Sequence, residues 1–126
     1  MAQPRILLIE DNEENLALMV FILKHFGFSC VTANDGDIGL QRSKQEKFDL
    51  IVCDIHLPTL SGFDVIAQLQ RDEYTKDIPV IAVTAYAMLG DKEKILSAGF
   101  RGYISKPIEA TTFANQIQSF LRGNDA

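Results

Sequence analysis

Five polar side chains, each beside the end of a short apolar run, are the residues of this chain best suited to chemistry. They are Glu10, Asp11, Asp54, Thr84 and Lys106. Apolar runs of this length are typical of strands buried in a parallel sheet. In an open α/β sheet, ligands bind just outside the carboxyl ends of the strands. We therefore expect the five side chains to converge on one pocket, although they are spread over almost the whole chain.

The combination of three carboxylates, one hydroxyl and one ammonium group favours a divalent cation and a phosphoryl group. Carboxylates held together repel one another unless a cation lies among them, and a set of oxygen ligands suits Mg²⁺. A lysine and a threonine beside Mg²⁺ are suitable for holding phosphoryl oxygens. Taken alone, Asp54 could be a turn former, Lys106 a solvated loop lysine and Thr84 a helix cap. The functional interpretation depends on the whole set occurring together.

The elements that must position these residues follow from the hydrophobic pattern, which alternates strand and helix five times. We expect strands at about 5–10, 28–33, 49–54, 78–83 and 101–105, and helices at about 13–26, 36–46, 61–72, 87–97 and 109–121. Strict alternation with short loops predicts an α/β fold, a doubly wound three-layer sandwich with helices on both faces of a parallel sheet. Asn12 is expected to cap the first helix and Gly27 to end it.

Size and composition indicate one compact domain. The chain has 126 residues, and we expect a single domain over 1–126, with its core at about 5–121 and a tail at 122–126. A net charge of −5 argues against non-specific binding to nucleic acid or to an anionic membrane. With no apolar stretch of spanning length and no signal-peptide pattern at the start, we expect a cytoplasmic protein. Cys30 and Cys53 lack metal-ligand spacing and are expected to be reduced core residues.

The motifs around these residues closely resemble the receiver domain of bacterial response regulators. They are Leu8-Ile9-Glu10-Asp11-Asn12, Cys53-Asp54-Ile55-His56-Leu57-Pro58 with Ser61-Gly62-Phe63, the segment 79–85, and Tyr103-Ile104-Ser105-Lys106-Pro107. The resemblance runs from Ile6 to Leu121. Segment 82–91 looks most like single-domain receivers of the DivK type and the receivers of hybrid kinases. The resemblance implies a CheY-like, flavodoxin-like (βα)5 fold with strand order 2-1-3-4-5.

The resemblance also implies a phosphoacceptor in a two-component phosphorelay rather than an enzyme acting on other substrates. Asp54 would accept the phosphoryl group from a phosphohistidine of a sensor kinase or of a histidine phosphotransfer protein. Lys106 would pair with Asp54 and then with a phosphoryl oxygen, and the Thr84 hydroxyl would bond another. The implied Mg²⁺ ligands are Glu10, largely through a water, Asp11, Asp54 and the backbone carbonyl of His56. Such catalysis consists of positioning and charge neutralisation.

A switch and two protein contacts belong to the same implied function. Thr84 would shift toward the phosphoryl group and Tyr103 would turn inward, changing the surface of the fourth helix, fifth strand and fifth helix for a downstream protein. From the sequence alone, Tyr103 fits a half-buried strand aromatic equally well. The positions that match kinase docking are Glu14, Asn15, Leu18, Pro107 and Ile108. The protein would act as a monomer or as a phosphorylation-linked dimer.

The first helix carries two apolar stripes whose burial the pattern leaves open. One consists of Leu16, Val20 and Leu23, and the other of Leu18, Phe21 and Ile22. The pattern alone favours burial of both stripes, and partial exposure of the second for a partner is the alternative. The resemblance favours docking at Leu18, while Phe21 and Ile22 are expected to pack.

Two backbone and lifetime features are also implied by the resemblance. The Lys106–Pro107 peptide bond is expected to be cis, which would aim the lysine into the pocket. His56 and Tyr86 would flank the path of attacking water, and the aromatic ring at 86 predicts slow self-hydrolysis. The His56 side chain itself is expected to have no role as a metal ligand or base, because the sequence gives a single loop histidine no second ligand or acid–base group of the kind that either role needs.

Other functions fit parts of the pattern. A Mg²⁺-dependent phosphatase of the haloacid-dehalogenase type also uses an Asp nucleophile with a Thr and a Lys. Such enzymes carry a second Asp two residues after the first, where this chain has His56. A receiver-like interaction module that is never phosphorylated is a further alternative, which failure to bind Mg²⁺ would favour. A flavodoxin-like electron carrier fits less well, since no phosphate-cradling loop follows the first strand.

Overall fold

Five strands and five helices alternate along the chain in a computed structural model that describes residues 3–85 and 89–123. The strands are β1 (Arg5–Ile9), β2 (Ser29–Ala33), β3 (Leu50–Asp54), β4 (Val80–Thr84) and β5 (Gly102–Ser105). The helices are α1 (Glu13–His25), α2 (Gly36–Gln45), α3 (Gly62–Arg71), α4 (Leu89–Ser97) and α5 (Ala110–Leu121). None of these helices is long and apolar enough to cross a membrane.

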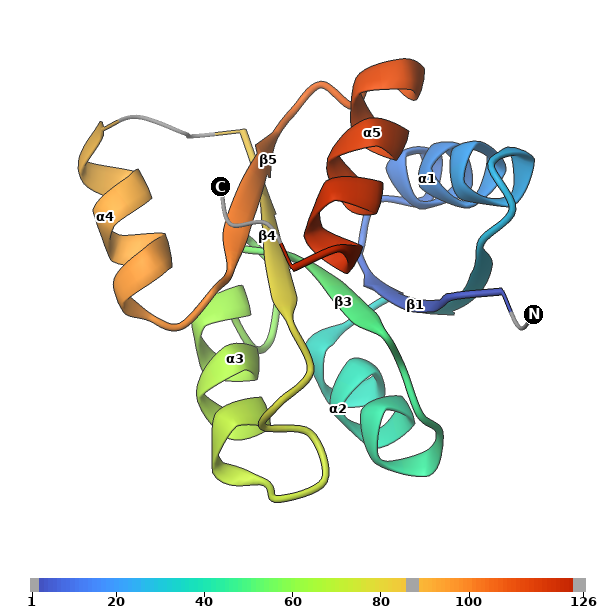
Figure 1. Ribbon diagram of the computed structural model, residues 1–126. Coiled ribbons are helices and arrows are strands. Elements are labelled where there is room, and N and C mark those ends of the chain that lie inside the picture. The colour runs from blue at the N-terminus through green and yellow to red at the C-terminus, as the bar shows by residue number, and fades with distance from the viewer. Residues whose placement is uncertain (1–2, 86–88, 124–126) are drawn as a thin grey trace.

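The strands form one parallel sheet in the order β2-β1-β3-β4-β5, which confirms the predicted order. Figure 1 shows α1 and α5 on one side of this sheet and α2 and α3 on the other. Each of the helices α1 to α4 carries the chain back to start the next strand in the same direction. All five strands therefore end at the same edge, and the residues that follow them are brought together there.

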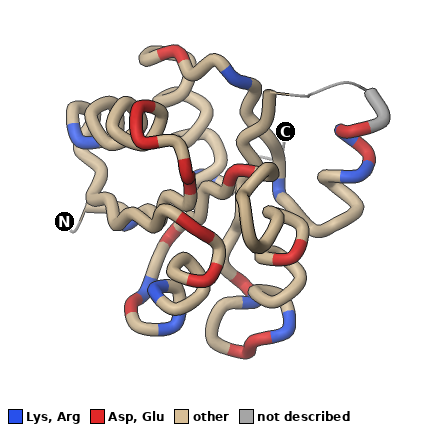
Figure 2. The backbone as a smooth tube through the Cα atoms, turned by 180° about the vertical axis from the view of Figure 1, so that it is seen from behind, with Lys and Arg blue, Asp and Glu red and all other residues tan. Residues whose placement is uncertain are grey.

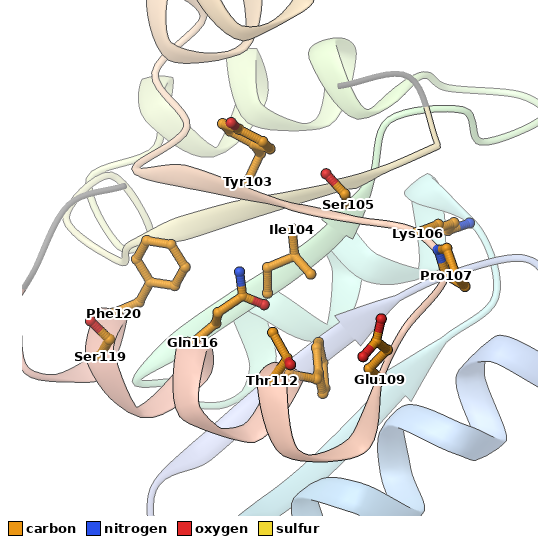
Figure 3. Close-up of a pocket in the computed structure, with 11 residues that line it drawn as sticks. Tyr103, Ile104, Ser105, Lys106, Pro107, Glu109, Thr112, Gln116, Ser119 and Phe120 are labelled. Carbon is orange, nitrogen blue, oxygen red and sulfur yellow. The ribbon is translucent and has the colours of Figure 1, made fainter. Parts of the chain in front are cut away.

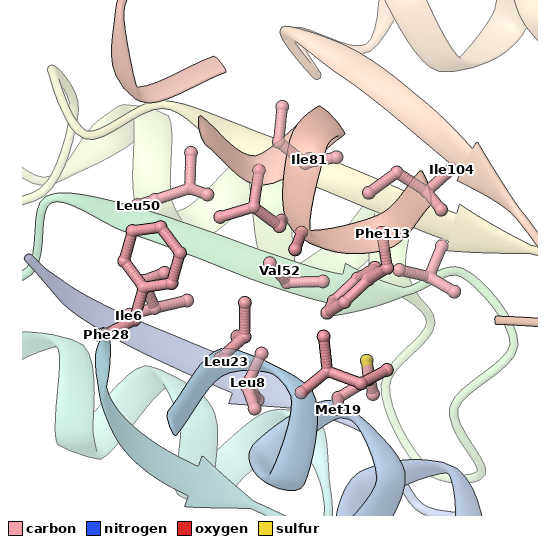
Figure 4. Packing of buried hydrophobic residues seen from close by; sticks show 14 of the residues in the cluster. Ile6, Leu8, Met19, Leu23, Phe28, Leu50, Val52, Ile81, Ile104 and Phe113 are labelled. Carbon is pink, nitrogen blue, oxygen red and sulfur yellow. The ribbon is translucent and has the colours of Figure 1, made fainter. Parts of the chain in front are cut away.

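The sheet is buried on both faces, which explains why its strands are apolar almost throughout. Successive residues of β1 point to opposite faces, so Ile6 and Leu8 pack with α1 and α5, while Leu7 and Ile9 pack with α2, α3 and α4. Figure 4 shows the first of these two clusters, in which Phe113 of α5 lies over the strands. Two separate apolar layers thus fix the helices to the sheet.

The helix ends match the local sequence signals. The Asn12 side chain accepts a hydrogen bond of 2.9 Å from the Asn15 amide and caps α1. Gly27, at φ 90°, follows the last turn of α1, where glycine is favoured because it has no Cβ. At α3, Ser61 and Asp64 form a capping box. The caps at Asn12 and Ser61 fix where α1 and α3 begin relative to the ends of β1 and β3.

Strand β4 differs from its predicted range in a way that matters for the site. It covers Val80–Thr84 rather than 78–83, because Pro79 has no N–H for the sheet and pairing continues to Thr84 opposite Ser105. Thr84 is therefore the last residue of a strand and is 2% exposed. The expected start of the fourth helix and Tyr86 lie outside the described residues.

The second apolar stripe of α1 is divided between core and surface, which corrects the expectation that Phe21 packs. Ile22 is 2% exposed, whereas Leu18 is 38% and Phe21 72% exposed. A helix on the outside of a sheet buries only one side, and Leu18 and Phe21 lie three residues apart on the opposite side. Both cysteines are free, Cys53 buried and Cys30 half-buried.

We expect Phe113→Ala to lower the free energy of unfolding by about 3–5 kcal/mol, because removing a buried ring leaves a cavity. Phe113 is 1% exposed in the cluster between α5 and the sheet. Phe21→Ala is the matched control and should change stability by less than about 0.5 kcal/mol. Urea denaturation followed by circular dichroism measures both. Equal losses would contradict the placement of Phe21 at the surface.

Candidate functional site

Four of the five predicted polar residues line one cleft at the carboxyl edge of the sheet. The cleft has a volume of about 550 Å³ and is lined by Glu10, Asp11, Asn12, Asn15, Asp54, His56, Ala85 and Lys106. Thr84 lines a neighbouring hollow of about 270 Å³ between α3 and α4 instead, together with Ile55, Phe63 and Ile95. The two cavities share His56, so the threonine lies beside the cleft rather than in it.

Lys106 connects the two buried carboxylates. Its Nζ lies 3.0 Å from Oδ2 of Asp54 and 3.1 Å from Oε1 of Glu10. The contact with Asp54 is a hydrogen bond, whereas the contact with Glu10 lacks hydrogen-bond geometry and leaves Oε1 a buried oxygen without a hydrogen bond. The backbone N–H of His56 donates to Oδ1 of Asp54 at 2.9 Å, and that of Asn12 donates to Oε2 of Glu10 at 3.2 Å.

Three carboxylates meet at this point. Single oxygens of Glu10, Asp11 and Asp54 all lie within 4.8 Å of one another. Glu10 is 1% and Asp54 4% exposed, whereas Asp11 is exposed. One lysine cannot neutralise three carboxylates, and the buried oxygen of Glu10 is left without a hydrogen bond. An oxygen-only donor set with this deficit fits a hard divalent cation.

Burial and neighbouring groups shift the pKa values of Glu10 and Asp54 in opposite directions. Burial, followed by the neighbouring carboxylate of Asp54, raises the pKa of Glu10 to about 7. Burial alone would also raise the pKa of Asp54, but its close contact with the Glu10 carboxyl and hydrogen bonds from the His56 amide and Lys106 lower it below its usual range. Burial opposes the charge on Lys106, but its two carboxylate partners raise its pKa. Asp54 is thus held as a carboxylate beside a lysine that stays protonated.

The peptide bond between Lys106 and Pro107 is cis, as expected. The Lys106 amide also donates a hydrogen bond of 2.9 Å to the carbonyl of Thr84, the last residue of the neighbouring strand. The backbone that carries the lysine is therefore tied to β4.

Comparison with known proteins identifies the family to which this chain belongs. A model described as the response regulator receiver domain matches residues 6–118. The chain belongs to the response regulator receiver family. It is 40% identical over 116 residues to the polar-differentiation response regulator DivK of Brucella anthropi, a match covering 92% of this chain and 94% of DivK. The receiver is therefore a phosphoacceptor of two-component signalling.

Solved structures agree with this assignment. The receiver domain of the sensor histidine kinase PA1611 from Pseudomonas aeruginosa PAO1 is 30% identical with a TM-score of 0.87, covering 98% of this chain and 100% of that domain. That structure has a magnesium ion coordinated in its active-site cleft. The chemotaxis protein CheY4 of Vibrio cholerae, 23% identical with a TM-score of 0.88 over 93% of this chain and 98% of its own, shares the fold. The resemblance to DivK-type and kinase-linked receivers is confirmed.

The switch candidate Tyr103 lies at the opposite side of β5 from α5. It is half-buried against the cluster that contains α4, and Nζ of Lys92 lies 5.4 Å from its ring centroid. Figure 3 shows Tyr103 and Ser105 pointing away from α5, while Ile104 points toward it. A groove of about 580 Å³ runs between β5 and α5 beside these residues of the receiver.

The structure places the docking candidates unequally. Glu14 and Pro107 are exposed, Leu18 is 38% exposed, and Asn15 lines the cleft. Ile108 is only 8% exposed and packs in the core with α1 and α5, so it is not a surface contact. The side chain of an apolar residue just before a helix is buried here because α5 closes over the sheet.

Sequence reasoning did not single out Asn12 or Ala85 as residues of the cleft, nor Phe63 as a residue of the hollow beside Thr84. Asn12 and Ala85 directly follow predicted site residues in the chain, which was the available signal. Phe63 comes from α3 and meets Thr84 only through the packing of α3 against the sheet, so no sequence spacing indicates it.

We expect the metal-free receiver to lose stability as the pH rises from about 5 to 8. The pKa of Glu10 is raised from 4.5 to about 7 by folding, so its contribution is fully present below pH 4.5 and lost as the pH rises through about 7. The loss should be on the order of 2–3 kcal/mol. Urea denaturation in EDTA measures it.

The control for this pH dependence is Glu10→Gln, which carries no titrating group and should show a much flatter profile over the same range. The lowered pKa of Asp54 acts only below its ordinary value of 3.8, outside this range. A wild-type profile that rises between pH 5 and 8, or an identical slope in Glu10→Gln, would show that Glu10 is not the titrating group.

Proposed function

We propose that Asp54 is the residue of this receiver that accepts the phosphoryl group. The observation that carries the proposal is the environment of its carboxylate, at the end of the central strand β3 and at the base of an open cleft. One oxygen accepts the His56 amide and the other accepts Lys106, at 2.9 and 3.0 Å. These donors keep Asp54 ionised, and a carboxylate that is ionised and fixed in position is a suitable nucleophile.

The proposed step transfers phosphorus from nitrogen to oxygen. A carboxylate oxygen of Asp54 attacks the phosphorus of a phosphohistidine, the P–N bond breaks, and its electron pair stays with the imidazole. The product is an acyl phosphate on Asp54. Lys106 is already 3.0 Å from this carboxylate and would follow the charge onto a phosphoryl oxygen. The Thr84 hydroxyl, in the adjoining hollow, would bond another phosphoryl oxygen after a small shift.

The same cleft would hold Mg²⁺, bound by Glu10, Asp11, Asp54 and the backbone carbonyl of His56. The cluster of three carboxylates and the buried oxygen of Glu10 without a hydrogen bond support this ligand set. The related PA1611 receiver, whose cleft holds magnesium, supports it as well. The ion would neutralise the carboxylates and the incoming phosphoryl oxygens, which is its usual contribution to phosphoryl transfer.

Other proteins would deliver the phosphoryl group and respond to it. We propose that a sensor kinase or a histidine phosphotransfer protein docks at Glu14, Asn15, Leu18 and Pro107. Thr84 and Tyr103 would couple phosphorylation to the surface of α4, β5 and α5, where a downstream protein binds. On this proposal the protein catalyses only its own phosphorylation and dephosphorylation. The expected cytoplasmic location, the single-domain boundary and the choice between monomer and dimer stay predictions.

Gly62 positions the loop that carries this chemistry. Its N–H donates to the carbonyl of Ile55 at 2.8 Å, folding the loop back onto the end of β3. A Cβ at this position would lie 2.6 Å from the carbonyl oxygen of Asp54 and 2.8 Å from Cα of Ile55, both backbone atoms. Only glycine allows this approach without moving the peptide next to Asp54, and the His56 carbonyl with it.

Incubation with acetyl phosphate and Mg²⁺ is expected to add one phosphoryl group to the intact protein. Intact mass spectrometry measures the gain. Asp54→Asn removes the nucleophile, and omission of Mg²⁺ removes the charge neutralisation, so both should abolish the gain. A Mg²⁺ titration of thermal stability in the same samples provides a readout that does not depend on phosphorylation.

Two outcomes would contradict the proposed role of Asp54. An equal mass gain in Asp54→Asn would place the phosphoryl group elsewhere. Binding of Mg²⁺ without any mass gain, from acetyl phosphate or from a phosphohistidine donor, would indicate a receiver-like module that is not phosphorylated.

We expect Gly62→Ala to weaken Mg²⁺ binding by about tenfold or more, since residues that support metal ligands have effects of this size. Gly36→Ala is the matched control, because its Cβ would lie 2.9 Å from Cβ of Leu60 and 3.0 Å from Cγ2 of Val65, which are side-chain atoms remote from Asp54. Urea denaturation and Mg²⁺ titration of both variants separate stability from affinity. Equal Mg²⁺ affinities at comparable stability would show that Gly62 serves folding only.

A further inference from the structure

Strand β2 forms an open edge of the sheet. It is last in the strand order, and β1 is the strand of the described chain with which it pairs. The N–H of Ser29 donates to the carbonyl of Pro4, and the carbonyl of Ala33 accepts from the residue after β1, so Ser29 and Ala33 face β1. Backbone groups alternate in direction along a strand. Cys30 and Thr32 therefore direct their N–H and C=O groups away from the sheet.

This edge lacks the features that usually prevent pairing with another strand, which are charged residues, proline and bulges. Residues 28–33 include no charged residue and no proline, and the pairing of β2 with β1 is continuous from Ser29 to Ala33. No hydrogen bond from a loop or side chain of the described chain reaches the backbone of Cys30 or Thr32. The length of β2, five residues, limits the edge but leaves the backbone groups of these two residues available.

The segments on either side of β2 carry opposite charges. Lys24 in the last turn of α1 and Asp37 in the first turn of α2 are both exposed. Neither forms an ion pair within residues 3–85 and 89–123. Figure 2 shows acidic residues at the start of α1 and a basic residue at its far end. Burial raises the pKa of the Cys30 thiol to about 11 against the opposing charge of Lys24, which places this ammonium group near the open edge.

We propose that two copies of this receiver pair through β2, with the strands antiparallel and a two-fold axis at Val31. Cys30 of one copy then lies opposite Thr32 of the second copy, and each such pair exchanges both of its backbone hydrogen bonds. The same symmetry brings Lys24 of each copy to the end of the paired strands where Asp37 of the second copy lies. These charges also suit the helix dipoles, but only this arrangement brings them together across the edge. Because the interface is the same on both copies, it closes at a dimer.

This pairing leaves the phosphorylation cleft open and goes beyond the proposed role of Asp54. Strand β1 lies between β2 and β3, which carries Asp54, and none of the residues that line the cleft belongs to β2. The two clefts face opposite directions because the paired strands are antiparallel. The dimer should therefore form equally in the wild type and in Asp54→Asn, with or without acetyl phosphate.

Sedimentation velocity of the full chain, from micromolar to millimolar protein, measures the association. Thr32→Pro removes an N–H that points away from β1, so it should weaken association by about tenfold or more and leave the ladder with β1 intact. Thr32→Val keeps the N–H and is the matched control, with association close to that of the wild type. Urea denaturation of both variants shows whether the fold is preserved.

Charge reversal tests the same arrangement without a proline. Lys24→Glu and Asp37→Lys should each weaken association at low ionic strength, because each places like charges at both ends of the paired strands. The double variant restores opposite charges and should associate nearly as well as the wild type. The differences should shrink in 1 M salt, where exposed charges are screened within about 3 Å.

Disulfide formation tests the register. Val31 lies opposite Val31 of the second copy in a pair without backbone hydrogen bonds, where Cα atoms are about 4.5 Å apart and a disulfide can form. Val31→Cys in a Cys30→Ser background should therefore give a covalent dimer on mild oxidation. Thr32→Cys in the same background is the register control, since its partners lie diagonally at about 7–8 Å and should crosslink poorly. Cys53 is fully buried and does not compete.

Three results would overturn this dimer. The first is a monomer at every concentration. The second is a dimer that Thr32→Pro or the charge reversals leave unchanged, or that crosslinks as well through position 32 as through position 31, because it would use another surface or register. The third is association that appears only after phosphorylation. None of these results bears on Asp54 as the phosphoacceptor, which the mass gain from acetyl phosphate tests separately.

Discussion

The rest of the structure must offset the repulsion among three carboxylates. The ends of two adjacent strands hold single oxygens of these groups within 4.8 Å of one another. Two of them are almost fully buried, and only one lysine lies within ion-pair distance of both. Such an arrangement is costly in the absence of a cation. The fold tolerates it because the two apolar layers on either face of the sheet supply the stability that this edge lacks. Because the carboxylates repel one another, the site favours a divalent cation, and with that cation bound it can accept an anionic group.

The ionisation of the carboxylates in the site depends on their environment rather than on their residue type. Glu10 and Asp54 are both buried carboxylates, yet the pKa of one is raised and that of the other lowered. Asp54 has donors on both oxygens, whereas Glu10 has an oxygen without a hydrogen bond. The carboxylate with more hydrogen-bond donors is Asp54, at the end of the central strand β3. On the proposed function, these neighbours would make Asp54 the nucleophile and leave Glu10 to the metal.

The carboxyl edge of the sheet also determines the charge that an approaching partner protein meets. Because a helix follows each strand, the acidic first turns of α1, α2 and α3 lie at the same edge of the sheet as the cleft, and the negative charge extends beyond Glu10, Asp11 and Asp54. The groove between β5 and α5 meets the cleft at Lys106, which lines both, and Tyr103 lies further along β5 in the same groove. On the proposed function, Lys106 would therefore connect the site that accepts the phosphoryl group with the groove beside β5 and α5.

The sequence by itself determined the alternation of elements, the parallel sheet and the identity of the polar residues at its edge. These features are local: apolar runs, caps such as Asn12, and polar residues directly after strands. Family motifs supplied the strand order and the expected roles of Asp54 and Lys106, which spacing alone leaves open. Tertiary structure decided what depends on packing between elements. It buried Ile108 under α5, left Phe21 at the surface, extended β4 to Thr84 and brought Phe63 beside that threonine. It also decided the pKa difference between Glu10 and Asp54, because burial and hydrogen bonds are set by residues far apart in the chain.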